Sequence, residues 1–203
     1  MAKEGRTSRK LLTPAEYFEL FRESKALLDG HFLLTSGKHS NLYMQCAQVL
    51  QYPDRAAVLA EKLASEFENQ NVQTVIGPAM GGMLVAHETA RALGVRALFT
   101  ERENGVMNLR RGFTLTPGER VLVVEDVITT GGSVREVIAV VRELGAVPVG
   151  VGVLVDRTDG AIDFGMPLSS IIQLEMKAFE AAECPLCAEG IPVVKPGSRM
   201  IVS

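Results

Sequence analysis

The chain has 203 residues, of which 47% are hydrophobic and 22% are charged, and its formal net charge is -3. These values suit one compact α/β domain and exclude a global positive field that would draw the chain to nucleic acid or an anionic membrane. The basic N-terminus MAKEGRTSRK is followed by no apolar segment, and no run of about 18 apolar residues occurs. We therefore expect a cytoplasmic protein with a frayed N-terminal tail.

The first quarter of the chain predicts a helix, a strand pair and a second helix. Thr13 is a candidate N-cap, with a proline next to it and a capping-box glutamate at position 16, and Gly30 stands where such a helix would stop, so a helix is expected over 14–29. Residues 31–50 mix β-branched, aromatic and turn residues, which indicates a strand, a turn and a strand. Apolar residues then recur at helical spacing over 53–69.

From residue 74 onward, short apolar strands alternate with helices. We expect strands at 74–77, 96–100, 120–126 and 147–156, and helices at 83–93 and 133–144. This alternation predicts a central parallel sheet that is flanked by helices on both faces. Residues 101–119 interrupt the pattern with no apolar periodicity. A loop of that length in a compact domain is usually functional or disordered.

The segment from Val121 to Ser133 carries the strongest chemical signal. An apolar strand ends in Glu125 and Asp126 and runs through a hydroxyl- and glycine-rich turn into a helix. The start of a helix offers unpaired N–H groups to a phosphate, and two carboxylates at the carboxyl end of a strand can accept hydrogen bonds from sugar hydroxyls. On its own, such a turn would be an ordinary connection between a strand and a helix. Together with both acids it predicts a phosphate-plus-ribose site, whereas neither GxGxxG nor the P-loop motif is present.

The segment from Val123 to Ser133 resembles the motif with which type I phosphoribosyltransferases bind phosphoribosyl pyrophosphate (PRPP). The resemblance implies that fold over a single domain, residues 1–203, with a core at about 53–159 and a small hood formed by about 11–50 and 160–203. It also implies that the acid pair holds the ribose hydroxyls and that the following residues bind PRPP and its 5-phosphate, namely Val127, Ile128, Thr129, Thr130, Gly131, Gly132 and Ser133.

Other segments, from about residue 11 to residue 199, resemble the orotate branch of that family. Residues 36–43, SGKHSNLY, resemble a strand pair that covers the orotate ring, which implies ring contact for Tyr43 and an anion contact for Lys38. Spacing alone describes Tyr43 equally well as a core residue. The resemblance further places Thr129 close to the base.

Arg157 ends the last predicted core strand, and the resemblance implies that it binds orotate. A planar guanidinium suits the carboxylate and carbonyl edge of that ring. The alternative is a purely structural ion pair of this arginine with Asp156 or Asp159.

Two segments resemble the parts of the family that handle pyrophosphate. Residues 76–82, IGPAMGG, resemble the pyrophosphate loop, with Met80 and Gly81 where many orotate enzymes carry a lysine. Residues 101–112 resemble a flexible loop that closes over the reacting centre and reaches the neighbouring subunit. This loop has no lysine or histidine and offers Arg102, Arg110 and Arg111, of which Arg102 matches the family's loop arginine best. The alternative is that these charged residues lie on a surface loop, where they contact only solvent and bind no ligand.

The resemblance implies transfer of the phosphoribosyl group of PRPP to orotate, giving orotidine 5'-monophosphate and pyrophosphate in pyrimidine biosynthesis. It implies Mg²⁺ held mainly by PRPP, catalytic roles for Arg102, Glu125 and Asp126, and a homodimer with shared active sites. A purine or uracil salvage phosphoribosyltransferase remains an alternative, because the PRPP motif does not report the base. A PRPP-sensing regulator is a further one, although the sequence has no DNA-binding extension or basic face.

The three cysteines include one CxxC pair. A zinc site would normally need a second pair or nearby histidines. The cysteines are Cys46, Cys184 and Cys187, and the histidines are His31, His39 and His87. We therefore expect a reduced, tight turn at 184–187 rather than a zinc site or a redox pair.

Overall fold

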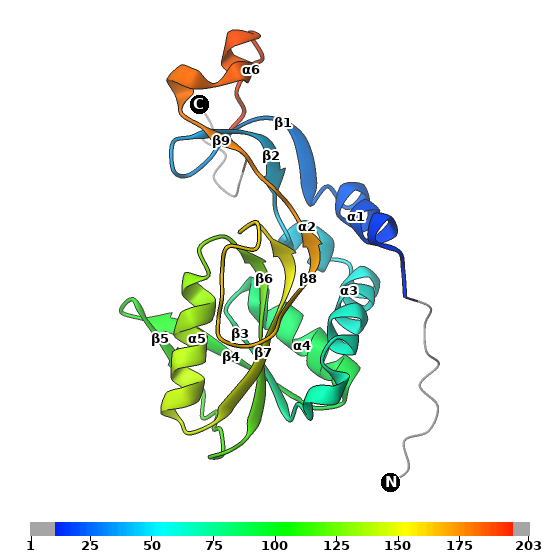
Figure 1. Ribbon diagram of the computed structural model, residues 1–203, viewed down its shortest axis with the longest axis vertical. Helices are drawn as coiled ribbons and strands as arrows, with labels where there is room; N and C mark the ends of the chain where they lie inside the picture. The colour runs from blue at the N-terminus through cyan, green and yellow to red at the C-terminus, as the bar shows by residue number, and fades with distance from the viewer. Residues whose placement is uncertain (1–10, 197–203) are drawn as a thin grey trace.

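The computed structural model describes residues 11–196, which form a main sheet with helices on both faces and a smaller sheet beyond its upper end (Figure 1). The predicted N-terminal tail, residues 1–10, and the last part of the predicted hood, residues 197–203, lie outside the described residues. Within the described range, none of the helices has the length and apolarity needed to span a bilayer.

The main sheet has six strands in the order β5-β4-β3-β6-β7-β8. Five of them are parallel and β5, at one edge, is antiparallel to β4. The predicted parallel sheet is thereby confirmed, although β8 lies beyond residue 159, where the sequence places the end of the core. The bounds are β3 (Thr74–Pro78), β4 (Arg96–Glu103), β5 (Val106–Leu109), β6 (Arg120–Ile128), β7 (Val147–Asp156) and β8 (Leu168–Gln173).

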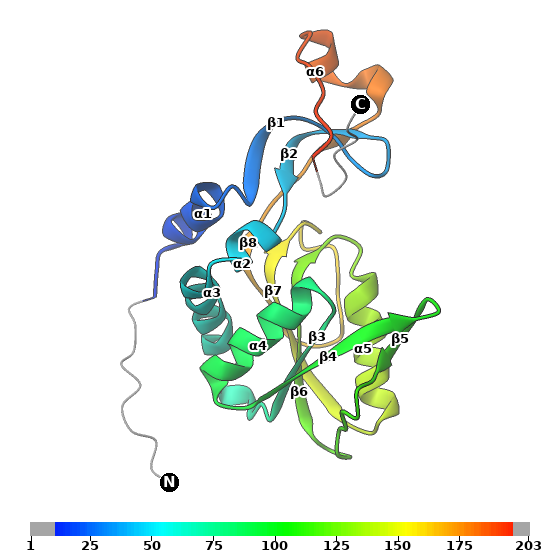
Figure 2. The same cartoon turned by 180° about the vertical axis from the view of Figure 1, so that it is seen from behind.

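Each face of the main sheet has its own apolar core, because successive strand residues point to opposite faces. Val75 and Leu122 face one core, together with α1 (Pro14–Glu23), α3 (Pro53–Ser65) and α4 (Gly81–Leu93). Ile76 and Val123 face the other core, which α5 (Gly132–Glu143) covers. Seen from behind, α3 and α4 lie together at one side of the sheet and α5 at the other (Figure 2).

The small sheet joins the two ends of the chain. It consists of β1 (Leu27–Leu33), β2 (His39–Met44) and β9 (Ala178–Phe179), all antiparallel, so the predicted strand-turn-strand is confirmed. Beyond β9 follow the short helices η2 (Ala181–Glu183) and α6 (Pro185–Ala188), and α2 (Ala47–Leu50) leads from β2 to the core. N-terminal and C-terminal segments thus lie side by side in the hood (Figure 1).

Two predicted helices are shorter in the structure than in the sequence pattern. The first ends at Glu23 rather than at residue 29, because Lys25 adopts a left-handed conformation with φ 57° and the chain then enters β1. The second ends at Ser65, and the end of its predicted range overlaps the 3-10 turn η1 (Glu68–Gln70).

Part of the predicted loop at 101–119 is a β-hairpin. Strand β4 continues to Glu103, pairs with β5, and turns at Asn104 and Gly105, whose φ angles are 53° and 83°. Asn-Gly is a strong hairpin signal because both residues tolerate positive φ, as a tight hairpin turn requires. The prediction of a structureless loop is therefore wrong for residues 101–109.

We predict that Gly150→Ala destabilises the protein, because a Cβ at this position of β7 would lie 2.5 Å from Cε1 of the buried Phe67. Overpacking of this kind costs about 1–3 kcal/mol, measured as the free energy of unfolding in urea. Gly132→Ala is the matched control, since its Cβ would meet no atom closer than 3.7 Å. Equal stability of the Gly150→Ala protein and the wild type would contradict this packing.

Candidate active site

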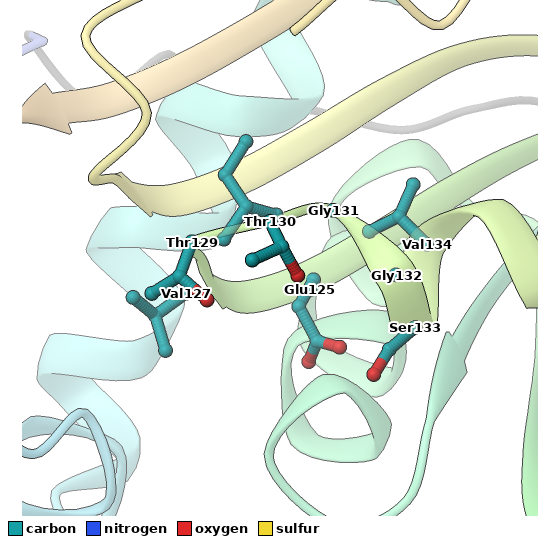
Figure 3. A pocket seen from close by; sticks show the side chains of 9 residues that line it. Glu125, Val127, Thr129, Thr130, Gly131, Gly132, Ser133 and Val134 are labelled. Atoms are coloured by element: carbon teal, nitrogen blue, oxygen red, sulfur yellow. The ribbon is translucent and has the colours of Figure 1, made fainter. Parts of the chain in front are cut away.

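The carboxyl end of β6 and the start of α5 form an open pocket. Its volume is about 270 Å³, counted with the solvent at its mouth. The carboxylate of Glu125 and the hydroxyls of Thr130 and Ser133 lie on the same side of the loop (Figure 3). The pocket is lined by Glu125, Val127, Ile128, Thr129, Thr130, Gly131, Gly132, Ser133 and Val134. The predicted acid and the predicted phosphate loop therefore share one pocket.

The N-terminus of α5 is suited to an anion. Its N-cap, Gly131, has φ 71°, and no side chain caps the helix. The first turn has a main-chain hydrogen bond from the N–H of Arg135 to the carbonyl of Gly131, at 3.0 Å. The N–H groups before Arg135 have no acceptor within a regular helix, so they are available to a ligand, and the helix dipole favours negative charge there.

Glu125 and Asp126 form a closely spaced acid pair. Glu125 is buried, its Oε1 accepts a hydrogen bond from the Asp126 N–H at 3.1 Å, and Asp126 Oδ1 accepts one from the Val127 N–H at 2.9 Å. Burial, reinforced by the negative charge of Asp126, raises the pKa of Glu125 to about 8. The ionised pair would be stabilised by hydrogen-bond donors or positive charge from a ligand.

Two glycines let α4 approach the acid pair. A Cβ at Gly81 would lie 2.3 Å from Asp126 Oδ2, and one at Gly82 would lie 2.9 Å from Glu125 Oε1. Met80, just before them, is 79% exposed. The segment that resembles the pyrophosphate loop thus lies directly against the carboxylates, as a site for the adjoining parts of one ligand requires.

The arginines of the predicted loop are paired with glutamates. Arg102 lies 2.5 Å from Glu136 of α5, and its charge also lowers the pKa of Glu125, so it is within electrostatic range of the acid pair. The other two pair with acids of β4: Arg110 lies 3.0 Å from Glu103, and Arg111 lies 3.0 Å from Glu101. Only Arg102 is linked to the acid pair by these interactions.

Arg157 follows β7, and its Nε is buried without a hydrogen-bond partner in the part of the chain that the structure describes. Within residues 11–196 it forms no ion pair, so the alternative of a structural pair with Asp156 or Asp159 is not observed. Asp156 instead accepts a hydrogen bond from the Thr158 N–H at 2.7 Å. Burial lowers the pKa of Arg157. A buried donor with no protein acceptor is a candidate for ligand binding.

Tyr43 and Lys38 lie in the hood, outside the residues that line the pocket. The Tyr43 hydroxyl donates to Gln45 at 3.5 Å, and its ring packs 5.7 Å from that of Phe32. Lys38 forms an ion pair with Glu180 at 2.9 Å, which raises the pKa of the lysine. The structure does not bring these two residues to the pocket, and their contact with a base stays a prediction.

Two residues change the composition of the predicted site. The side chain of Ile128 packs in the core beneath α5, so this residue can offer only its main chain to a ligand. Gly82 is absent from the predicted site residues, although a Cβ at this position would lie 2.9 Å from Glu125 Oε1, and its signal was the last glycine of IGPAMGG. Cys46 places its thiol 3.7 Å from the Asp126 carbonyl, and burial raises the pKa of this thiol well above its usual value.

Residues 45–184 match the family model of the phosphoribosyl transferase domain. The chain is 61% identical over 186 residues to orotate phosphoribosyltransferase of Desulforamulus reducens, covering 92% of this chain and 97% of that protein. It is 57% identical over 183 residues to the enzyme of the same name from Caldanaerobacter subterraneus subsp. tengcongensis, covering 90% and 96%. The chain belongs to the orotate phosphoribosyltransferase family.

A solved member of this family has the same architecture. The crystal structure of orotate phosphoribosyltransferase from Aeropyrum pernix aligns with a TM-score of 0.63 at 30% identity, over 77% of this chain and 93% of that one. The type I phosphoribosyltransferase fold implied by the sequence is therefore confirmed.

We predict that Glu125 makes stability fall as pH rises. Its folded pKa of about 8 lies above the ordinary 4.5, so the folded state holds a proton that the unfolded state loses between these values. The stabilisation from this proton is complete below about pH 4.5 and is lost as pH rises through about 8. In Glu125→Gln this contribution disappears, so the variant should gain stability relative to wild type between pH 5 and pH 8.5 in thermal unfolding scans. A difference that is independent of pH would contradict the assignment.

Proposed function

We propose that this member of the orotate phosphoribosyltransferase family transfers the phosphoribosyl group of PRPP to orotate, which gives orotidine 5'-monophosphate and pyrophosphate in pyrimidine biosynthesis. The observation that carries the proposal is the acid pair near the end of β6, of which Glu125 is buried, followed by the uncapped N-terminus of α5. A carboxylate pair and an anion site at this spacing suit the ribose and the 5-phosphate of one ligand.

In this proposal the loop and the acids divide PRPP between them. The N–H groups at the start of α5 and the hydroxyls of Thr129, Thr130 and Ser133 surround the 5-phosphate. Glu125 and Asp126 accept hydrogen bonds from the 2- and 3-hydroxyls. Because those hydroxyls donate to the ionised acid, PRPP should lower the raised pKa of Glu125 on binding.

The pyrophosphate end of PRPP would lie near Met80 and Gly81, which border Asp126. When bound to PRPP, Mg²⁺ would supply positive charge at the pyrophosphate and ribose oxygens. The acid pair fits such an ion, because Mg²⁺ prefers hard carboxylate oxygens and no lysine or arginine forms an ion pair with either acid within residues 11–196. Arg102 is the arginine whose charge already acts on Glu125.

Orotate would be held at the edge formed by β6 and β7. The buried Nε of Arg157 would donate to the orotate carboxylate or carbonyl, and Thr129 would lie close to the ring. The hood would cover the base through Tyr43 and Lys38. Lys38 would first have to exchange Glu180 for the substrate anion.

The proposed reaction is a displacement at the anomeric carbon of PRPP. The orotate ring nitrogen forms the new glycosidic bond while the carbon–oxygen bond to pyrophosphate breaks, and that electron pair leaves with pyrophosphate. The ribose passes through an oxocarbenium-like state, which the nearby carboxylates stabilise. Orotate is already anionic or readily ionised, so the reaction needs no strong protein base.

A homodimer with shared sites and a cytoplasmic location belong to the same proposal. The β4–β5 hairpin supports the sharing of sites, because it carries Arg102 and ends in the 62% exposed Val106. A hairpin of this kind could reach a second subunit, where it would also exclude water from the reacting sugar.

The proposal is tested by the loss of orotate absorbance with purified protein, PRPP and Mg²⁺, with uracil, adenine and hypoxanthine as competing bases. Turnover that requires PRPP and orotate supports it. Turnover of another base would keep the fold and overturn the substrate, and PRPP binding without turnover would indicate a sensor.

Replacing Arg157 should impair the use of orotate far more than the binding of PRPP. A charge-assisted hydrogen bond contributes about 1.5–3 kcal/mol, so Arg157→Met should lower kcat/KM for orotate about 10- to 150-fold. The dissociation constant of PRPP, from calorimetry, should change less than about threefold, because the PRPP groups bind at β6 and α5. Arg142→Met, on the exposed last turn of α5, is the matched control. Equal losses for both substrates would contradict the assignment of Arg157 to orotate.

A further inference from the structure

The hood contains a cluster of side chains that the proposed reaction does not use. His31 of β1, His39 of β2, and the CxxC residues Cys184 and Cys187 place their four ligand atoms within 4.8 Å of one another. Both histidines and Cys184 are buried, whereas Cys187 is exposed. The sequence pattern argued against a metal because no second ligand pair lies near the CxxC, but the fold supplies that pair from β1 and β2.

The spacing of these atoms fits a tetrahedral metal site. Zinc at about 2.0–2.1 Å from nitrogen and about 2.3 Å from sulfur separates a tetrahedral nitrogen–sulfur pair by about 3.5 Å. The structure has 3.5 Å from Cys184 Sγ to His31 Nε2, 3.8 Å from Cys187 Sγ to the same nitrogen, and 3.3 Å from Cys187 Sγ to His39 Nδ1. The two ring nitrogens are 2.8 Å apart, so they would separate by about half an ångström around a metal.

The hydrogen bonding of His31 leaves its inner nitrogen with a lone pair. Its Nδ1 lies 2.7 Å from the carbonyl of Ile191, which can only accept, so Nδ1 carries the proton. In a neutral imidazole the other nitrogen, Nε2, is then an acceptor. His39 Nδ1 and both sulfurs converge on this one nitrogen, and a single cation would satisfy all of them. A metal-binding histidine typically donates its other N–H to a carbonyl in this way.

The surrounding segment has little else to hold it in place. Beyond Leu174, Cys184 is the one buried residue of the described chain, and from Lys177 to residue 196 no residue contributes to either apolar core. Its other links to the β1–β2 hairpin, within the described residues, are the short β9 pairing, main-chain hydrogen bonds between Val194 and β1, the hydrogen bond from His31 to the Ile191 carbonyl, and the Lys38–Glu180 ion pair. Small modules without a core commonly depend on a structural metal.

We propose that His31, His39, Cys184 and Cys187 bind one structural Zn²⁺ that fastens the C-terminal segment to the β1–β2 hairpin. A mixed set of two nitrogens and two sulfurs in tetrahedral arrangement is typical of zinc. Four protein ligands fill its coordination sphere, so the metal would be structural and would take no part in phosphoribosyl transfer. This site is independent of the proposed function and of the Mg²⁺ carried by PRPP.

The metal content of the full chain tests this proposal directly. Protein made without a histidine tag and purified without chelators should contain about one zinc per chain by elemental analysis. After zinc is removed under reducing conditions, Co²⁺ should bind in the same ratio, with thiolate-to-cobalt absorption and the visible bands of a tetrahedral site. Absence of stoichiometric zinc, together with absence of this cobalt spectrum in the reduced wild type, would overturn the proposal, and so would a Cys184–Cys187 disulfide in the isolated protein.

Variants separate the cluster from the other cysteine and histidine. Cys184→Ser, Cys187→Ser and His39→Asn should each lose most of the metal, and the exposed Cys187 makes its variant the one with the least effect on packing. Cys46→Ser and His87→Asn, which lie outside the cluster, should keep it. Chelation should lower the thermal midpoint of the wild type and leave that of Cys187→Ser unchanged. If these cluster variants still contained about one zinc per chain, the proposal would be wrong, even if their folding were impaired.

Discussion

The candidate active site depends on the burial of β6 between β3 and β7. This strand pairs with β3 through Ile76 and Val123 and with β7 through Ile128 and Asp156, and both of its faces are covered by apolar residues. Because the three strands are parallel, their carboxyl ends meet at one edge of the sheet. That edge brings together the start of α4 at Gly81 and Gly82, the acid pair of β6 and Arg157 after β7.

The same burial makes the site electrostatically unfavourable without a ligand. Glu125 is shielded from water beside a second carboxylate, which raises its pKa, and Arg157 has a buried donor without an acceptor among the described residues. Groups in such states commonly mark functional sites, because a ligand of complementary charge relieves both. The neighbouring α5 N-terminus supplies the opposite partial charge, so an anionic sugar phosphate can be bound where free carboxylates alone would repel it.

The hood is stabilised by different interactions from those of the main sheet. The main sheet is stabilised by two apolar cores, whereas the last described segment is held by polar contacts, short strand pairing and the His–Cys cluster. Strand β2 links these features, since it carries His39 of the cluster as well as Tyr43, the residue proposed to cover the base. A metal that fastens the C-terminal segment to the β1–β2 hairpin would therefore also hold β2 in place, the strand proposed to cover the base.

The sequence by itself determined the parallel sheet and the β6–α5 motif, because strand and helix periodicity and the residues from Glu125 to Ser133 are local in the chain. The Asn104–Gly105 turn was local as well, and reading it would have revealed the β4–β5 hairpin. Only the tertiary structure decided that Arg157 lacks an ion-pair partner among residues 11–196 and that the CxxC pair meets two histidines. The contacts between the two cysteines and the two histidines join residues that are 148 to 156 positions apart in the chain. Strand pairing between the two ends of the chain brings them together, and no local spacing predicts it.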